Sequence, residues 1–203
     1  GRFKDEIVPI EVPAGKRGAD PVLFDTDEHV RYDTTLEKLA SLRPAFQEDG
    51  TVTAGNSSGI NDGAAAVLMM NAERAEAEGY APLGRVRGTG VAGTEPDVMG
   101  IGPIHSTPKA LRAAGVEMGD IGLAELNEAF ASQALACAQV LKIDLDRMNV
   151  NGGAIGLGHP LGCTGARMMT TLLYEMKRRD ETLGLATMCI GGGQGISTVV
   201  ERT

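Results

Sequence analysis

The sequence lacks the cysteine and histidine patterns that stabilise small secreted domains or zinc-binding domains. It has three cysteines, Cys137, Cys163 and Cys189, and none of them forms a Cys-x-x-Cys pair. Three is too few, and an odd number, for a disulfide framework. With only three histidines beside them, we expect no structural zinc and no other metal site. Unpaired thiols are typical of a reducing compartment, so we predict a cytoplasmic protein.

Long apolar runs and an excess of positive charge are also missing. No stretch approaches the ~20 apolar residues that a membrane helix needs, and the N-terminus has no signal-peptide pattern, so we expect no membrane contact. The formal net charge of −8 argues against nonspecific nucleic-acid binding. The 203 residues suit one domain, or one domain plus part of another. Because the chain starts at Gly1 without a Met, we expect it to be cut from a longer one.

Glycine, in contrast, is abundant. It makes up 28 of the 203 residues, which is about twice the usual share of roughly 7%. One glycine-dense turn, residues 151–165, presents His159 just before Pro160, and another, residues 189–195, presents Cys189. Glycine lets a ligand approach the main chain closely, and proline stiffens the chain. One such turn could be a tight crossing with an incidental surface histidine, but two turns that present a His and a Cys indicate an assembled active site.

The hydrophobic pattern predicts an α/β fold. We expect helices at about 107–114, 128–141 and 165–178, and strands at 84–91, 121–126, 148–151, 184–190 and 196–201. This βαβαβαββ order predicts right-handed crossovers and a mostly parallel sheet with an antiparallel final pair and helices on its faces. Ligands bind such sheets where the strands end.

The first part of the chain gives weaker signals. The apolar run 64–70 predicts a buried strand. Asn71 is expected to cap the next helix and Gly79 to close it, and Thr34 and Glu37 have the spacing of a capping box. Residues 88–93 match the dinucleotide-binding pattern G-x-G-x-x-G, but the prolines and glycines that follow are incompatible with the helix that this motif requires. We therefore reject a dinucleotide site.

Motifs along the whole chain resemble those of the thiolases, the acetyl-CoA C-acyltransferases, and occur in family order. They are Gly-Asn-Ser-Ser-Gly-Ile-Asn-Asp-Gly-Ala-Ala-Ala at 55–66, Asn-Glu-Ala-Phe at 127–130, Asn-Gly-Gly-Ala-Ile-Gly-Leu-Gly-His-Pro-Leu-Gly at 151–162 and Cys-Ile-Gly-Gly-Gly-Gln-Gly at 189–195. The resemblance implies a CoA-dependent Claisen condensation of acyl-CoA, or the thiolytic cleavage of 3-ketoacyl-CoA, with acetoacetyl-CoA as the expected substrate. Such a reaction belongs to fatty acid metabolism, and the sequence leaves its direction open.

The resemblance also implies catalytic roles. His159 and a water held by Asn127 would stabilise the enolate oxygen, and His159 would activate the nucleophile. Cys189 would be the acid/base, and the amide of Gly191 would contribute to a second oxyanion hole. Without the resemblance, Asn127 could be a helix N-cap before Glu128, and Cys189 could be a buried strand cysteine.

Further positions are implied for the substrates, coenzyme A and acyl-CoA, with no permanently bound cofactor. Ser58 would lie by the pantetheine arm, Met99 and Phe130 would line the acyl pocket, and Phe46 and Arg31 would lie beside the nucleotide end. Without the resemblance, Met99 and Phe130 would be ordinary core residues. The basic cluster that includes Arg31 would either hold phosphates or pair with acidic neighbours; its other members are Lys38 and Arg43. We assign structural roles to Cys137 and Cys163, and no role to His105.

Thiolases consist of two similar domains with a loop domain between them. By resemblance, residues 1–60 would be the C-terminal part of the loop domain, 61–82 the last strand and helix of the N-terminal thiolase domain, and 83–203 the C-terminal thiolase domain. The earlier half, which carries the nucleophilic cysteine, has no counterpart here. We therefore expect a fragment, a split subunit or a cleaved chain that pairs with the N-terminal half and assembles as a homodimer or homotetramer. The alternative is a non-catalytic CoA- or acyl-binding subunit of thiolase fold.

Overall fold

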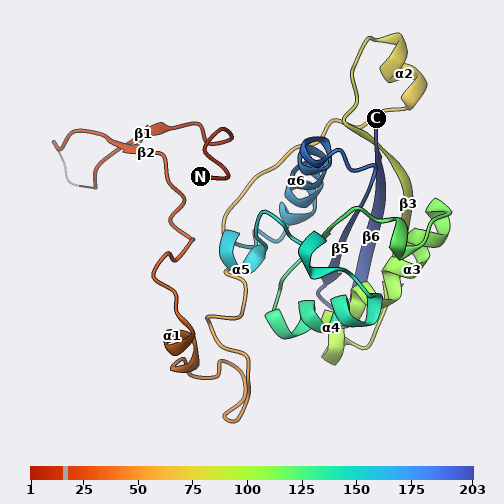
Figure 1. Cartoon of the computed structure of the whole chain (residues 1–203). Helices are drawn as coiled ribbons and strands as arrows, with labels where there is room; N and C mark the ends of the chain where they lie inside the picture. Colours follow the sequence, from red (N-terminus) through yellow and green to blue (C-terminus); the bar gives the residue numbers. More distant parts are fainter. Residues whose placement is uncertain (16–17) are drawn as a thin grey trace. The chain divides into compact units, whose positions relative to one another are not determined.

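The computed structural model describes residues 1–15 and 18–203, which form two compact units, residues 1–34 and 35–203. The first unit contains a short antiparallel strand pair, β1 (Ile10–Val12) and β2 (Val22–Phe24) (Figure 1). Most of its side chains are exposed. Every residue with a predicted catalytic role belongs to the second unit.

The second unit is built on a four-stranded mixed sheet in the order β3-β6-β5-β4. Strands β3 (Gly84–Gly93) and β5 (Leu183–Ile190) both run antiparallel to β6 (Gln194–Arg202), whereas β4 (Leu123–Leu126) runs parallel to β5. The α/β class and the antiparallel final pair are confirmed. The prediction of a mostly parallel sheet is wrong, because β6 lies between β3 and β5 and runs against both.

Helices cover both faces of this sheet. Helices α3 (Gly102–Ala114) and α4 (Ala131–Leu141) pack on one face, and α6 (Thr164–Arg179) packs on the other (Figure 1). The bounds of α4 and α6 were predicted to within three residues, whereas α3 begins five residues before its predicted start at 107. The shorter elements are α1 (Leu36–Ala40), α2 (Ala72–Ala77), α5 (Ala154–Leu157) and the 3-10 turns η1 (Pro96–Ile101), η2 (Met118–Asp120) and η3 (Leu145–Arg147).

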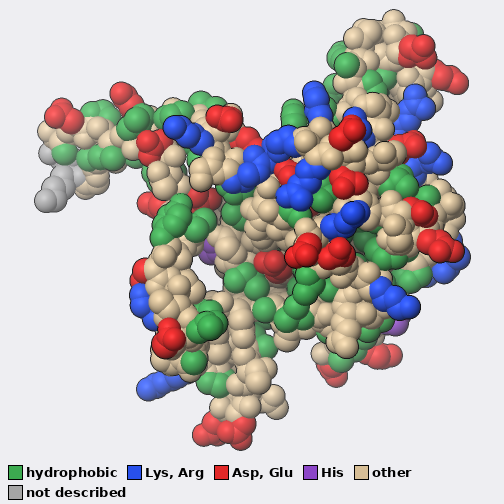
Figure 2. Space-filling model, in the orientation of Figure 1, with side chains coloured by type: hydrophobic (Ala, Val, Ile, Leu, Met, Phe, Trp, Pro, Cys, Tyr) green, Lys and Arg blue, Asp and Glu red, His purple; other side chains and the backbone are tan. Residues whose placement is uncertain are grey.

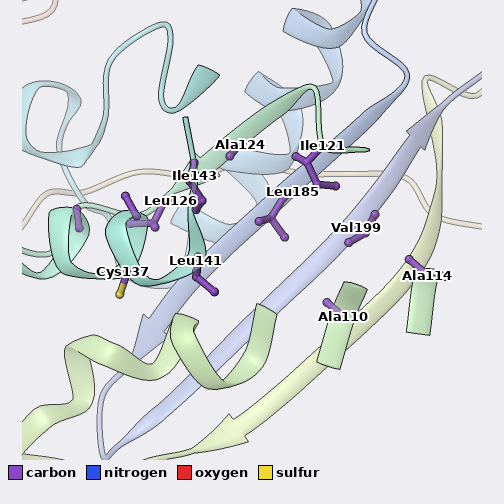
Figure 3. Packing of buried hydrophobic residues seen from close by; sticks show 12 residues of the cluster. Ala110, Ala114, Ile121, Ala124, Leu126, Cys137, Leu141, Ile143, Leu185 and Val199 are labelled. Carbon is purple, nitrogen blue, oxygen red and sulfur yellow. The ribbon is translucent and has the colours of Figure 1, made fainter. Parts of the chain in front are cut away.

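The larger hydrophobic core lies between the sheet and helices α3 and α4. Figure 3 shows Leu185 and Val199 from the central strands between the alanines of α3 and the side chains of α4, among them Leu141. On the opposite face, Leu172 and Met176 of α6 pack in a smaller cluster with residues of β4 and β6. Burial of these apolar side chains stabilises the sheet–helix layers at about 25 cal/mol per Å².

Buried hydroxyl groups join α3 to the sheet close to the end of β5. The hydroxyl of Ser197 on β6 lies 2.7 Å from that of Ser106, 3.0 Å from that of Thr107 and 2.7 Å from that of Thr187 on β5. All four side chains are at most 1% exposed. Since buried polar groups are costly unless they are paired, this network fixes the position of α3 over the strands.

Two predicted strands do not form. Residues 64–70 form no strand and pair with none of the described strands, and Leu68 is 77% exposed. Residues 148–151 make only one bridge, from Met148 to Ala124. Asn149 then takes a left-handed φ of 47°, and its side chain bonds the backbone of Leu126 where a strand would continue.

The predicted helix caps are partly confirmed. Asn71 caps α2, with its side-chain oxygen accepting from the amides of Glu73 and Arg74, and Gly79 follows the helix in a left-handed conformation. The capping box is wrong by one residue. Thr35, not Thr34, is the N-cap of α1, because the hydroxyl of Thr34 donates instead to the carbonyl of Arg31.

The glycines of the rejected dinucleotide motif lie inside β3, so no helix opens on them. They allow α3 to pack directly on the strand. A Cβ added at Gly88 would lie 2.5 Å from the amide nitrogen of Ala114, and one added at Gly90 would lie 2.5 Å from that of Ala110 and overlap the carbonyl of Ser106. Close helix–strand packing explains these glycines.

The surface carries charges of both signs. On the face that Figure 2 shows, acidic and basic side chains are interspersed. Several form ion pairs, including Arg87 with Glu201 and Arg202 with Asp180. Within residues 1–15 and 18–203, every helix is too short or too polar to span a membrane.

The packing of α3 on β3 gives the first prediction. The change Gly90→Ala should lower the free energy of unfolding by about 1–3 kcal/mol, because the added methyl meets backbone atoms that cannot move independently. The matched control is Gly119→Ala, where an added Cβ has no neighbour within 4 Å, and its effect should stay within about 0.5 kcal/mol. Urea unfolding followed by circular dichroism measures both. Equal stabilities of the two variants would contradict the packing argument.

Candidate active site

The turn that carries His159 is held by glycine conformation and by Asn61. Helix α5 ends at Gly158, whose φ of 95° belongs to the left-handed region that favours glycine. A Cβ there would lie 2.6 Å from the side-chain oxygen of Asn61, the same oxygen that accepts a hydrogen bond from the amide of His159 at 3.0 Å. The predicted turn before a helix is present, although it follows a short helix rather than a strand.

Hydrogen bonds determine which nitrogen of the His159 imidazole carries the proton. Nδ1 lies 2.7 Å from the hydroxyl of Thr164, and this hydroxyl donates its own proton to the carbonyl of Pro160 at 2.9 Å. The hydroxyl can therefore only accept from the ring, so Nδ1 is protonated. Nε2 is then the acceptor, and the side-chain amide nitrogen of Asn127 lies 3.3 Å from it.

The surroundings of His159 favour the neutral ring. Its side chain is buried, at 9% exposure. Burial, and after it the positive charge of Arg167, lower the pKa of His159 below its ordinary value. A neutral imidazole with an unprotonated Nε2 is a Brønsted base, which is the form that can accept a proton from a thiol.

Asn127 lies directly after β4, at the edge where this strand ends. Its backbone amide donates to the carbonyl of Thr187 at 3.0 Å, which continues the parallel pairing of β4 with β5 by one residue. The side chain is 1% exposed, and its oxygen has no hydrogen-bond partner among the described residues. The N-cap interpretation is wrong, because α4 starts at Ala131 with Phe130 as its N-cap. This side chain is free to hold a donor with its oxygen while it donates to His159.

Cys189 lies at the end of the neighbouring strand. It pairs with Gly195 across the turn between β5 and β6, and it is buried at 7% exposure. Burial raises the pKa of the Cys189 thiol, so the protonated thiol is favoured. Because β4 and β5 are parallel neighbours, Asn127 and Cys189 lie at the same edge of the sheet. Within the described part of the chain no hydrogen bond joins Cys189 to His159, so their convergence on one substrate stays a prediction.

The turn after Cys189 depends on glycine. Gly192 and Gly193 have φ values of 84° and 86°, and a Cβ on Gly193 would overlap the carbonyl of Thr94. Thr94 in turn donates its amide to the carbonyl of Gly193 at 2.8 Å. Gly191 is exposed and has open space around its α-carbon. A substrate can therefore approach the backbone at Gly191, whose oxyanion role stays a prediction.

Several residues predicted for coenzyme and acyl binding are brought together. The amide of Ser58 donates to the carbonyl of Ala129 at 3.0 Å, which places Ser58 beside Phe130. The rings of Phe46 and Phe130 meet edge to face, with centroids 5.8 Å apart. Met99 is half-buried in η1. Their roles, and that of Arg31 in the first unit, stay predictions.

Residues that the sequence analysis did not assign complete the site. Thr164 fixes the tautomer of His159, and Asn61 accepts a hydrogen bond from its backbone amide. Asn61 lies in the motif at 55–66, and Thr164 lies just after the motif at 151–162. Glu125 of β4 and Arg167 of α6 form an ion pair at 3.1 Å in the same region. Sequence spacing gives no signal for any of these contacts, because each joins segments that meet only in the folded chain.

The fold is that expected of thiolases, and the comparison with known proteins agrees. The chain belongs to the thiolase family: the thiolase N-terminal domain matches residues 1–73, and the thiolase C-terminal domain matches residues 80–202. It is 55% identical to an acetyl-CoA acetyltransferase of Chromobacterium violaceum and 56% identical to a 3-ketoacyl-CoA thiolase of Bacillus subtilis. These matches cover 100% and 99% of this chain but only 51% and 53% of those proteins, so the chain spans about half the length of its relatives.

Solved structures give the same result. The crystal structure of human mitochondrial 3-ketoacyl-CoA thiolase matches 99% of this chain with a TM-score of 0.91 and 46% sequence identity, and this chain covers 50% of it. A structure of the human mitochondrial protein in complex with CoA matches with a TM-score of 0.87 and 43% identity. The predicted thiolase fold and family are confirmed.

The buried pair of Glu125 and Arg167 gives the second prediction. Burial raises the pKa of Glu125 to about 7, although Arg167 opposes the shift. Because the pKa is raised on folding, the folded chain binds more protons, and Glu125 contributes stability that is present below its ordinary pKa of 4.5 and lost as the pH rises through about 7.

The variant Glu125→Gln removes this titration. The unfolding free energy of the wild type minus that of the variant should fall between about pH 5 and about pH 8, by up to about 3 kcal/mol at 1.4 kcal/mol per pKa unit. Urea unfolding across this range measures the difference. A flat difference for Glu125→Gln would show that Glu125 does not titrate in this range.

Proposed function

We propose that this chain is the C-terminal portion of an acetyl-CoA C-acyltransferase that condenses acyl-CoA or cleaves 3-ketoacyl-CoA, with acetoacetyl-CoA as its substrate. The observation that carries the proposal is the contact between Asn127 and the unprotonated Nε2 of His159, beside a free amide oxygen. The names of the relatives support an acyltransferase, and the human structure with CoA supports coenzyme A as a substrate.

The first half-reaction uses His159 as a base. Its Nε2 takes the proton of a nucleophilic cysteine on the N-terminal half, and the thiolate attacks the thioester carbonyl. The tetrahedral oxyanion is stabilised by backbone amides that include Gly191. When it collapses, the C–S bond to coenzyme A breaks, CoA leaves with the proton from His159, and the acyl group remains on the cysteine.

The second half-reaction forms the carbon–carbon bond. Cys189 first passes its thiol proton to Nε2 of His159, and the thiolate then removes a proton from the α-carbon of a second acyl-CoA. The enolate oxygen is stabilised by the protonated His159 and by a water on the free oxygen of Asn127. The enolate carbon attacks the acyl-enzyme, the C–S bond breaks, and the leaving cysteine of the N-terminal half takes the proton from His159. In the reverse direction Cys189 donates its proton to carbon, and the protonated thiol favoured by burial is the form that this step needs.

The partner in this proposal is the N-terminal thiolase half. The relatives are about twice as long as this chain, and residues 64–70 form an extended, exposed apolar run with no strand partner in the described chain. We assign this run to the edge of a sheet in that half. By analogy with the family the assembly is a homodimer or homotetramer. The three free cysteines support a reducing, cytoplasmic location.

A non-catalytic subunit that binds CoA or acyl groups is the alternative. It would keep the ring contact of Phe46 with Phe130 but would need neither a neutral His159 nor an amide oxygen on Asn127 without a partner among the described residues. Orienting an imidazole through a buried threonine hydroxyl has a clear use in proton transfer and none in simple binding. The site therefore favours the enzyme.

The third prediction tests catalysis. Alone, this chain should not cleave acetoacetyl-CoA, whereas co-expression with the N-terminal half of the Bacillus subtilis relative should give turnover. In that complex, Cys189→Ala should lower kcat by at least about 100-fold while CoA binding is retained. Cys163→Ala, another buried cysteine, is the matched control and should keep most activity. Unchanged turnover in Cys189→Ala would favour the binding subunit, and turnover by this chain alone would contradict the need for a second half.

The fourth prediction tests the partner surface. Replacing exposed Leu68 by Asp should weaken association with the N-terminal half by at least about tenfold, because a charge would be buried at the new strand pairing. Leu145→Asp, at 55% exposure in η3, is the matched control and should leave association unchanged. Analytical ultracentrifugation of the co-purified halves measures both. Equal association of the two variants would exclude residues 64–70 from the interface.

A further inference from the structure

Glu128, the residue after Asn127, connects the end of β4 to the start of the turn that carries His159. One oxygen of its carboxylate accepts a hydrogen bond from the side-chain amide of Asn149 at 2.9 Å, and the other accepts from the backbone amide of Ile155 at 3.2 Å. Ile155 lies in α5, four residues before His159. The carboxylate therefore bridges the two segments from which the Asn127–His159 contact is made.

Asn149 supports the same bridge from the other side of Asn127. Its side-chain oxygen accepts from the amide of Leu126 at 2.9 Å, and its side-chain nitrogen donates to the carbonyl of Leu126 at 2.8 Å and to Glu128. The side-chain amide of Asn149 thus holds both the backbone of Leu126 and the side chain of Glu128, the residues on either side of Asn127. The left-handed φ of Asn149 gives this side chain its direction.

Gly153 leaves room for the carboxylate. A Cβ added there would overlap all three atoms of the Glu128 carboxyl group. The backbone of Gly153 has φ −115° and ψ −170°, which any residue adopts. The three atoms nearest to a Cβ at position 153 are therefore all in the carboxyl group of Glu128. From Gly153 the chain is rigid up to the histidine, since the carbonyls of Gly153 and Ala154 accept from Leu157 and Gly158.

We propose that Glu128 is a positioning residue for the enolate-stabilising pair: its carboxylate, held between Asn149 and Ile155, sets the distance from the Asn127 amide to the His159 imidazole. The inference rests on the proposed function, in which that pair stabilises the enolate. Glu128 itself does not touch the reacting atoms. A carboxylate is needed because both groups that face it are donors, and a Gln at this position would turn its own NH2 group toward one of them.

A double-mutant cycle with Glu128→Ala and Gly153→Ala tests this in the full 203-residue chain. The readout is the 15N spectrum of the His159 imidazole, assigned by its loss in His159→Asn, because these shifts distinguish the Nδ1–H and Nε2–H tautomers. Glu128→Ala should leave the proton on Nδ1, where Thr164 holds it, but should shift the Nε2 resonance toward that of a ring nitrogen that accepts no hydrogen bond, since the Asn127 donor moves away from Nε2. Gly153→Ala should do the same by displacing the carboxylate. In the double variant the added methyl meets no carboxylate, so its effect should equal that of Glu128→Ala alone.

Controls and a kinetic measurement complete the test. Glu201→Gln removes another hydrogen-bonded carboxylate, the partner of Arg87, and should leave the His159 spectrum unchanged. In the complex with the N-terminal half, Glu128→Gln should lower kcat by about 10- to 100-fold and leave KM within about twofold.

The outcomes separate the two proposals. An unchanged His159 spectrum in folded Glu128→Ala, or additive effects of Glu128→Ala and Gly153→Ala, would overturn the positioning role. If Glu128→Ala does not fold, Gly153→Ala and Glu128→Gln carry the test in the same spectrum. A wild-type complex without turnover would instead count against the proposed function, whatever the spectra show.

Discussion

The contact between the side chains of Asn127 and His159 is the interaction on which the site depends. It joins residues 32 apart in sequence, one following a strand and the other following a one-turn helix. The donor and acceptor of this contact are defined. The Thr164 hydroxyl donates its proton to the carbonyl of Pro160, so it can only accept a hydrogen bond from Nδ1 of His159. The hydroxyl of Thr164, five residues after His159, thus leaves Nε2 unprotonated and able to act as a base. The amide of Asn127 meets that base while its own oxygen stays free.

The sheet and helix α3 support the segments that carry Asn127 and His159. The sheet supplies two parallel strand ends, β4 and β5, and the buried hydroxyls of Ser106, Thr107, Thr187 and Ser197 fix α3 against β5 and β6. Glycines in β3 bring α3 close enough for those hydroxyls to meet. Substitutions far from His159 can therefore alter the site through strand position, even though they touch none of its residues.

The three long helices and the two glycine turns could be predicted from the sequence. The helices α3, α4 and α6 follow from apolar periodicity and from Gly115 or polar residues at their ends, and the glycine turns locate His159 and Cys189. The antiparallel pairing of β3 with β6 could not be predicted from any local sequence pattern, because strand order and register depend on the whole sheet. The run 64–70 has a strand's composition but pairs with none of the described strands. Contacts such as Thr164 with His159 need the chain to turn through Pro160, which spacing alone does not determine.

The electrostatics of the site bear on what the chain can do without a partner. Burial raises the pKa of the Cys189 thiol and lowers that of the His159 imidazole, so both groups favour their uncharged forms. The positive charge of Arg167 also lowers the pKa of His159. Arg167 forms an ion pair with Glu125, whose pKa lies at about 7. A charged imidazolium beside Asn127 therefore arises only when a proton is delivered to Nε2. The described chain contains no cysteine or other acid within hydrogen-bonding distance of Nε2 to deliver it, since the side chain of Asn127 occupies that position. In the proposed mechanism this proton comes from a cysteine thiol during the reaction, and the uncharged imidazole found here is the form that can receive it.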